Sequence, residues 1–184
     1  ESSVKSVSTD RGEIYCDSAV LAMGPWSLNA SEWIKQDIPI TPLKGQILRM
    51  KSDEVNLNMS VGWRGNYACT KPDGLLWAGT TEENTGFDDS TSAFGRDSVL
   101  TALTKMINGL DSAELVHHTA CLRPLSADGK IILGDVPNIS HLFIASGTGR
   151  KGILLGPGMG KITSDLITNQ PIGIDLNPFS LSRF

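Results

Sequence analysis

Ser-Gly-Thr-Gly-Arg-Lys-Gly-Ile-Leu-Leu-Gly-Pro-Gly (146–158) is a glycine-dense stretch, and the rest of the chain is organised around it. The apolar run 141–146 leads into it and predicts a buried strand, so the glycines occupy the turn after that strand. Glycine lets the backbone adopt angles that other residues avoid and approach a ligand closely. Arg123, from the segment Thr-Ala-Cys-Leu-Arg-Pro (119–124), and Arg150 flank the turn, and two converging guanidinium groups would bind a carboxylate.

The end of this stretch predicts where the following helix begins. Gly-Pro-Gly at 156–158 is unfavourable inside a helix, because proline lacks an N–H group and glycine lacks conformational restraint. We therefore expect an irregular turn over 149–155 and regular helix over 159–168. In that arrangement the helix dipole contributes little at the turn, and the N–H groups of the turn itself would meet an electron-rich partner.

Periodicity and turn signals predict the other elements. Asp-Arg-Gly at 10–12 and Lys-Pro-Asp-Gly at 71–74 are turn sequences between strand-like runs. The predicted strands are 3–8, 12–16, 18–23, 39–50, a meander over 59–80, 116–123, 130–133 and 141–146, and further helices are predicted at 26–34 and 92–108.

Composition excludes several classes of function. The 184 residues carry a net charge of −4 with a pI near 5.3, and no basic run is present, so nucleic-acid binding is not expected. No apolar run approaches the roughly 20 residues of a membrane span. The cysteines are scattered, which favours a reduced compartment with the cytoplasm as the expected location, and no Cys or His spacing fits a metal site. His117 and His118 have no nucleophile to activate, so no hydrolase triad is indicated.

A family resemblance rests on several motifs that occur in one order. Ala-Cys-Leu-Arg-Pro-Leu-Ser-Ala-Asp-Gly-Lys-Ile-Ile-Leu-Gly (120–134), followed by the glycine-dense stretch, resembles the C-terminal signature of the FAD-dependent D-amino-acid oxidase superfamily, with glycine oxidase as the nearest branch. Leu-Ala-Met-Gly-Pro-Trp-Ser (21–27), Pro-Leu-Lys-Gly-Gln (42–46) and Asn-Pro-Phe-Ser-Leu-Ser-Arg-Phe (177–184) match further parts of the family pattern. Each motif alone is weak, but the ordered set covers nearly the whole chain and is specific.

The resemblance implies an α+β fold. We expect an antiparallel substrate-domain sheet with flanking helices over 39–124, plus the C-terminal strands and helix of a split FAD-binding domain formed by 1–38 and 125–184. The family opens with a strand, a Gly-x-Gly-x-x-Gly turn and a helix that bind the FAD pyrophosphate, and no such pattern lies near residue 1. The expectation is therefore the C-terminal half of a longer flavoprotein, inactive alone, whose partner is the missing N-terminal FAD-binding half.

The resemblance also implies roles for individual residues. Arg123 matches the family's carboxylate-binding arginine, with a structural salt bridge as the alternative, and Arg150 would be a second substrate contact or a solvent-facing gate. Relatives often carry histidine where Thr148 stands, which is a departure from the family pattern. The implied FAD neighbours are Ala22, Gly24, Trp26, Gly147, Thr148, Gly149, Gly152, Ile153 and Leu154, although Trp26 also suits an ordinary strand-to-helix junction.

The implied reaction is oxidation of an amine or amino acid by hydride transfer to the flavin. Three alternatives remain open: a non-catalytic flavin- or partner-binding relative, a free-standing module for a small carboxylate, and a sarcosine-oxidase-like enzyme with flavin bonded to Cys121. Lys44 would lie near the flavin ring by resemblance, whereas a solvated lysine is the ordinary expectation for a strand.

Overall fold

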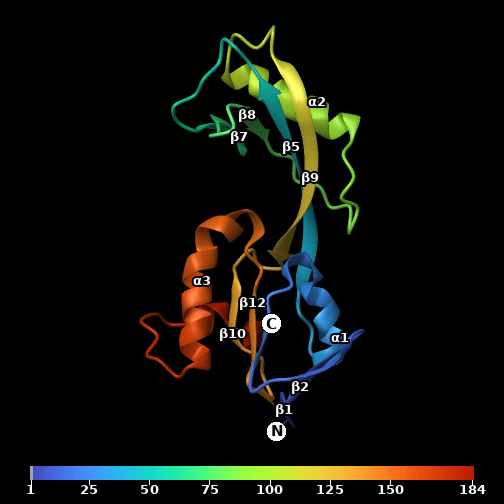
Figure 1. Ribbon diagram of the computed structural model, residues 1–184, viewed down its shortest axis with the longest axis vertical. Helices are drawn as coiled ribbons and strands as arrows, with labels where there is room; N and C mark the ends of the chain where they lie inside the picture. The colour runs from blue at the N-terminus through green and yellow to red at the C-terminus, as the bar shows by residue number, and fades with distance from the viewer. Residues whose placement is uncertain (1) are drawn as a thin grey trace. The chain divides into compact units, whose positions relative to one another are not determined.

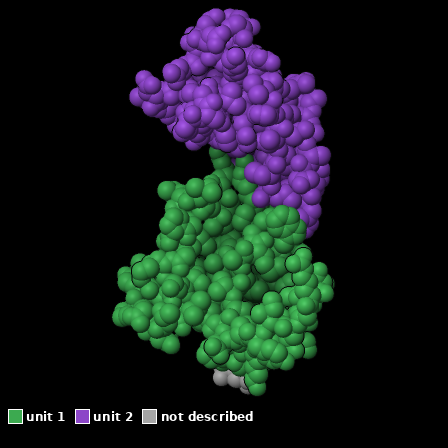
Figure 2. All heavy atoms as spheres, in the orientation of Figure 1, with its two compact units in different colours: residues 1–42, 123–184 green, residues 43–122 purple. Residues whose placement is uncertain are grey.

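The computed structural model describes residues 2–184, which form two compact units (Figure 2). Unit 1 comprises residues up to Pro42 together with Arg123–Phe184, and unit 2 comprises Leu43–Leu122. Two strands, β5 (Ile40–Lys51) and β9 (Glu114–Ser126), carry residues of both units. The functional domain limits expected at 38/39 and 124/125 stay predictions.

Unit 1 is built on a three-stranded sheet with the order β10-β12-β4. The central strand β12 (Leu142–Ser146) pairs in parallel with β4 (Ala19–Leu21) and antiparallel with β10 (Ile132–Asp135). Helix α3 (Gly152–Ile167) packs against β10 and β12 (Figure 1). The smaller elements are β1 (Ser2–Ser3), β2 (Ser6–Thr9), β3 (Gly12–Tyr15), β11 (Ile139–Ser140), α1 (Ala30–Ile34) and the 3-10 turns η1 (Gly24–Asn29), η2 (Gly149–Lys151), η3 (Asn177–Phe179) and η4 (Leu181–Arg183).

The apolar runs of the sequence supply the core of unit 1. Ile144 in β12 and Ile132 in β10 are fully buried, and α3 packs against both strands. Leu181, far along the chain in η4, is 1 % exposed and joins the same cluster. The buried members of the cluster are Leu21, Ala30, Ile38, Ile40, Ile132, Val136, Leu142, Ile144 and Leu181.

Unit 2 is a five-stranded sheet with helix α2 (Ala93–Met106) packed against three of its strands. The strand order is β6 (Val61–Trp63), β7 (Asn66–Thr70), β8 (Leu76–Gly79), β5 and β9. The β7–β8 hairpin is closed by Asp73, whose carboxylate accepts hydrogen bonds from the Leu75 N–H and the Trp77 indole N–H. The apolar stripe of α2 covers the sheet, and the cluster contains Leu48, Met50, Ala68, Leu76, Ala78, Val99 and Leu103.

A buried amide joins the sheet of unit 2 to the start of α2. Gln46 is fully buried, and its Nε2 donates to the Glu83 carboxylate at 2.8 Å and to the Ser92 hydroxyl at 3.0 Å. Its Oε1 accepts from the Ser92 backbone N–H at 2.9 Å, and Ser92 is itself the N-cap of α2, accepting from the Gly95 N–H. Gln46 therefore fixes both the loop before the helix and the helix start.

Lys44, on the same strand, is buried and paired. Its Nζ donates to Asp88 at 2.8 Å and lies 3.8 Å from Glu83, and only 3 % of the side chain is exposed. The hydrogen bond with Asp88 raises the pKa of Lys44 above its usual value, and the same bond lowers the pKa of the Asp88 carboxyl. The expectation of a solvated lysine is wrong, because the polar loop after β8 folds back over the strand.

The α+β class with an antiparallel sheet and flanking helices is confirmed, but the predicted start of the last helix is wrong. Regular helix begins at Gly152 and continues through Pro157 to Ile167. Proline removes only the hydrogen bond to the Ile153 carbonyl, and that residue is 97 % exposed, so water can satisfy the carbonyl. Burial of Met159 and Thr163 against the sheet outweighs the low helix propensity of the glycines.

The described part of the chain lacks a membrane-spanning helix, a disulfide bond and a metal-binding cluster. Across residues 2–184, no helix is long and apolar enough to cross a membrane. Cys16, Cys69 and Cys121 are all free thiols. The same residues hold no cluster of three His, Cys, Asp or Glu side chains suited to a metal ion. The cytoplasmic location stays a prediction.

Gly95→Ala tests the role of Gln46. A methyl group at Gly95 would overlap the Gln46 amide, so its three hydrogen bonds must rearrange, and we expect a loss of about 1–3 kcal/mol in unfolding free energy. The loss in unfolding free energy is measured by urea denaturation of the wild-type and variant chains.

Two controls accompany this measurement. In a Gln46→Ala background the same substitution should no longer destabilise, because the overlapping amide is gone. Gly160→Ala in α3 meets no atom within 4 Å and should be neutral or stabilise by up to ~1 kcal/mol. Additive losses in the Gln46→Ala background would contradict the proposed overlap.

Candidate functional site

Two glycine bends meet at the carboxyl ends of parallel strands in unit 1. β4 ends at Leu21 and is followed by Gly24, and β12 ends at Ser146 and is followed by Gly147. Both glycines have left-handed backbone angles, with φ of 56° and 75°. In open sheets of this type, ligands bind beyond the carboxyl ends of the parallel strands, so this edge is the candidate site.

A pair of buried hydroxyl groups ties the two bends together. The Ser27 hydroxyl donates to the Gly24 carbonyl oxygen at 2.7 Å and lies 2.8 Å from the Ser146 hydroxyl. The Ser146 Oγ also lies 3.2 Å from the same carbonyl oxygen. Both serines are almost completely buried, with exposures of 0 % and 3 %. The Gly24 bend is thereby held at a fixed position beside the residue that precedes Gly147.

Gly147 is also packed closely from the side of β10. A Cβ atom at this position would lie 3.2 Å from both the Lys130 carbonyl oxygen and the Ile132 backbone nitrogen. Together with its positive φ, this contact excludes larger residues. Beyond the bend, Thr148 pairs with Leu125 of β9 in an isolated antiparallel bridge. The backbone path through 146–148 is therefore fixed on both sides.

The same bridge brings the two predicted arginine positions into one neighbourhood. Arg123 lies two residues before Leu125, and Arg150 lies two residues after Thr148. The Leu125 side chain lies 3.8 Å from the Cβ position of Gly149, and alternation along β9 directs Arg123 to the same face as Leu125. Arg123 is half-buried and Arg150 is exposed, and the roles expected for them stay predictions.

Helix α3 starts directly after this bend. Residues 149–151 form the 3-10 turn η2, and α3 follows from Gly152, with the Lys151 N–H donating to the Thr148 carbonyl. The α3 N-cap, Lys151, makes no side-chain capping hydrogen bond. The N-terminal end of the helix dipole therefore lies at the bend, about two turns before the helix start at 159 that the sequence predicts.

The predicted cofactor residues fall into two groups. Gly24, Gly147, Thr148, Gly149 and Gly152 form the two bends and the helix start described above. The others are exposed: Ala22 and Trp26 beside the first bend, with Trp26 at 51 % exposure, and Ile153 and Leu154 in the first turn of α3, at 97 % and 78 % exposure. The exposed residues contribute surface near the bends and no close packing to them.

Ser27 and Ser146 are the site residues that sequence reasoning missed. A serine after an apolar strand carries no distinctive signal, and 119 positions separate the two hydroxyl groups. The only available clue was that each serine closes a family-like motif, Leu-Ala-Met-Gly-Pro-Trp-Ser at 21–27 and the strand that ends at 146.

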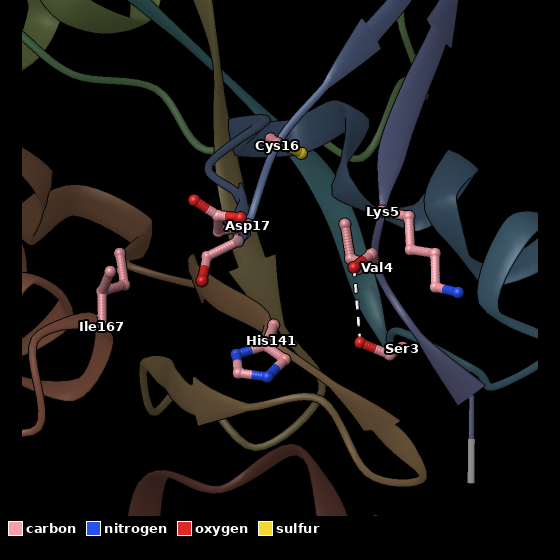
Figure 3. A pocket seen from close by; sticks show the side chains of 8 residues that line it. Ser3, Val4, Lys5, Cys16, Asp17, His141 and Ile167 are labelled. Carbon is pink, nitrogen blue, oxygen red and sulfur yellow. Dashed lines mark hydrogen bonds between the residues drawn. The ribbon is translucent and has the colours of Figure 1, made fainter.

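A polar recess lies at the opposite ends of the same strands (Figure 3). It has a volume of about 500 Å³ and is lined in part by Asp17 and Ser18, which precede β4, and by His141, which precedes β12. The sulfur of Cys16 does not point toward the His141 ring, so no thiol–imidazole pair is formed (Figure 3). This recess is therefore separate from the bends at the carboxyl ends.

The backbone at the first bend is open to a ligand. The Gly24 position has no atom within 4 Å of where a Cβ would be, so a ligand can approach the backbone there. The N-terminus of α3, next to the second bend, favours a partner that carries negative charge.

Comparisons with known proteins point in the same direction. The family model "FAD dependent oxidoreductase" matches residues 1–166. The glycine oxidase of Pseudomonas aeruginosa is 32 % identical over 177 residues, which are 96 % of this chain and 49 % of that protein. The crystal structure of glycine oxidase from Geobacillus kaustophilus superposes with a TM-score of 0.92 at 30 % identity and covers 97 % of this chain and 49 % of that one. Iminodiacetate oxidase from Chelativorans sp. BNC1 gives a TM-score of 0.88 at 25 % identity, with coverages of 96 % and 51 %. The chain spans about half the length of these proteins.

Removing the buried hydroxyl groups tests the tie between the two bends. Ser27→Ala and Ser146→Ala should each lower the unfolding free energy of the chain by about 1–2 kcal/mol, because each deletes a buried hydrogen bond. The double variant should lose less than the sum of the two losses, since both serines serve one network. The unfolding free energies of the wild type, the two single variants and the double variant are measured by thermal or urea unfolding. Strictly additive losses would show that the two hydroxyl groups act independently.

Proposed function

This chain belongs to the FAD dependent oxidoreductase family, and we propose that it supplies the C-terminal half of an amine or amino-acid oxidoreductase that resembles glycine oxidase. The observation that carries the proposal is the meeting of the Gly24 and Gly147 bends at the carboxyl ends of β4 and β12, with Arg123 two residues before Leu125, which pairs with Thr148. FAD, when bound, would accept a hydride from the carbon that bears the substrate nitrogen.

The protein's own residues would orient the substrate. Arg123 offers two parallel N–H donors, a geometry that matches a carboxylate, and its half-buried position strengthens such a pair relative to an exposed one. Arg150, exposed on η2, would attract the carboxylate at the entrance. The names of the relatives, glycine oxidase and iminodiacetate oxidase, describe substrates in which a nitrogen and a carboxylate share one carbon.

The bend and the helix start would hold the cofactor. The N–H groups of Gly152, Ile153 and Leu154 point along the axis of α3 toward its N-terminus, as in any helix, and would stabilise negative charge on the ring. The hydroxyl oxygen of Thr148 lies 3.0 Å from the Cβ position of Gly152, so Thr148 packs against the first turn of α3. Gly24, with Ala22 and Trp26 exposed around it, would contact the more polar end of the cofactor.

We also propose that the partner is the remaining, N-terminal half of the family fold. Within the described residues, β4 has a neighbour on one edge only, and a parallel strand of three residues is rarely left at an open edge. An apolar recess of about 790 Å³ runs beside it, lined in part by Val7, Leu21 and Trp33, and Trp33 is 66 % exposed. Such surfaces are normally covered in a complete protein.

We expect the chain alone and the complete protein to differ in their affinity for FAD. No Gly-x-Gly-x-x-Gly turn lies near residue 1, where the family carries its pyrophosphate-binding unit, so we expect the chain alone to bind FAD more weakly than roughly micromolar. Fluorescence quenching of FAD on titration with the chain measures this. Micromolar or tighter binding by the chain alone would show that the second half is not needed for the cofactor.

Arg123→Ala in the complete protein tests the carboxylate clamp. Loss of two charge-assisted hydrogen bonds should raise KM for a carboxylated amine such as glycine by roughly 10- to 100-fold. Arg123→Lys should recover little, because an ammonium group cannot make the parallel pair. KM is measured from steady-state turnover with an electron acceptor present, and flavin bleaching by the substrate is followed separately under anaerobic conditions.

Arg11→Ala is the matched control, because Arg11 is exposed in the β2–β3 turn, away from the bends. It should leave KM unchanged. Equal effects of the two alanine substitutions, or none for Arg123, would remove Arg123 from the site. Flavin colour without bleaching by any amine would favour the non-catalytic alternative, and flavin that stays on the denatured protein would favour covalent attachment at Cys121.

A further inference from the structure

The guanidinium group of Arg183, in η4 of unit 1, donates hydrogen bonds from all three of its nitrogens. Its Nε and one terminal nitrogen bind the two carboxylate oxygens of Asp128, both at 2.9 Å. The same terminal nitrogen donates to the Lys130 carbonyl at 3.2 Å, and the other donates to the Phe179 and Ser180 carbonyls at 2.8 and 3.0 Å. The side chain is 14 % exposed, so water competes little with these bonds.

The guanidinium group binds the turn at 126–130, which is also held by hydrogen bonds within the turn. Asp128 accepts from the Lys130 N–H and from the Ser126 hydroxyl, and Ser126, which is 2 % exposed, also donates to the Lys130 carbonyl. The Ala127 N–H donates to Pro39 and fixes the turn to the start of β5. The bond to Arg183 lowers the pKa of the Asp128 carboxyl from its usual 3.8, so this carboxyl remains ionised.

Both ends of this turn are paired with the bend that follows β12. Leu125, just before the turn, bridges to Thr148, and Ile132, just after it, is the partner of Ser146. The Lys130 carbonyl, which Arg183 binds directly, is also the atom that lies 3.2 Å from the Cβ position of Gly147. A shift of the turn would therefore move the backbone at 146–148.

We propose that Arg183 is a positioning residue for the Gly147 bend, acting through Asp128 and the Lys130 carbonyl. This inference rests on the proposed function for its relevance to catalysis, because the bend is the segment assigned to the cofactor. The guanidinium group itself contacts neither cofactor nor substrate in this assignment. Its effect is to hold the N–H groups after the bend in a single arrangement, so that no reorganisation is needed when the ligand binds.

A simpler role would be to fasten the C-terminal segment, which Leu181 already anchors in the core. The two roles are separable because Arg183 binds two different segments, the turn at 126–130 and the carbonyls of Phe179 and Ser180. Asp128→Asn weakens the link to the turn but leaves the bonds to the Phe179 and Ser180 carbonyls in place. Arg183→Gln removes both links.

Hydrogen exchange of the 184-residue chain, followed by mass spectrometry, tests the proposal. In both variants, peptides that cover 142–151 should exchange about tenfold faster or more, because the charge-assisted bonds that hold the neighbouring turn are lost. Peptides of unit 2 that cover 44–51 and 99–106 should be unchanged. The charge-matched control is Arg96→Gln, which removes a largely exposed pair with Asp97 in unit 2 and should leave 142–151 unaffected.

Three outcomes would overturn the proposal. Unchanged exchange at 142–151 in Asp128→Asn would leave Arg183 as a fastener of the C-terminal segment only. Equal acceleration in both units would indicate a general loss of stability, and so would failure of Arg183→Gln to fold combined with wild-type behaviour of Asp128→Asn.

Acid sensitivity tests whether the Arg183–Asp128 pair, through which the proposed positioning acts, contributes to stability. Because the folded-state pKa of Asp128 is lowered, its contribution to stability is present above the usual value near 3.8 and is lost as pH falls below it. The wild-type chain should therefore lose more stability below pH ~4 than Arg183→Gln, in which this carboxyl has no cationic partner. Parallel acid-unfolding curves would count against the coupling.

In the complete protein, Asp128→Asn should weaken FAD binding by about tenfold, measured from the flavin absorbance during titration. If the wild-type protein binds no FAD, the proposed function fails, while the exchange result still decides whether Arg183 positions the bend. If FAD binds equally well in wild type and Asp128→Asn, the positioning role fails and the proposed function stands.

Discussion

The buried contact between the Ser27 and Ser146 hydroxyl groups, with the Gly24 carbonyl oxygen as their common partner, is the constraint on which the site depends. Parallel pairing of β4 and β12 brings two strand ends to one edge, but it leaves the following bends free to diverge. A polar group buried without a partner is costly, so three such groups within hydrogen-bond distance favour one arrangement strongly. The glycine backbone of both bends is thereby presented to the same space.

The bend after β12 is supported from a second direction by the turn at 126–130. This turn is held by Arg183 from a distant part of the chain, and it contacts Gly147 through the Lys130 carbonyl. Charge-assisted, bidentate bonds are among the stronger polar contacts in proteins, and these are shielded from water. The result is a backbone segment with little freedom of its own, which is the property that the proposed cofactor site requires.

Unit 2 uses a comparable device for a different purpose. Gln46 and Lys44 project from one strand and fix the polar loop and the start of α2 through buried hydrogen bonds and an ion pair with Asp88. The family-like Pro-Leu-Lys-Gly-Gln motif is therefore explained here by folding: its lysine and its second polar side chain are both occupied within unit 2. Gly95 is required in this unit because the Gln46 amide lies where a side chain would be.

The sequence by itself determined the elements with strong local signals and the family to which the chain belongs. Period-two alternation, the Lys-Pro-Asp-Gly turn at 71–74 and the apolar stripe of α2 depend on neighbours in the chain, so they could be recognised without coordinates. Only the tertiary structure decided the start of α3, where burial of Met159 overrides a local preference against Gly-Pro-Gly. It also decided the burial of Lys44 and the meeting of Ser27 with Ser146. These contacts join residues tens of positions apart, and no local pattern specifies which distant groups will share a buried space.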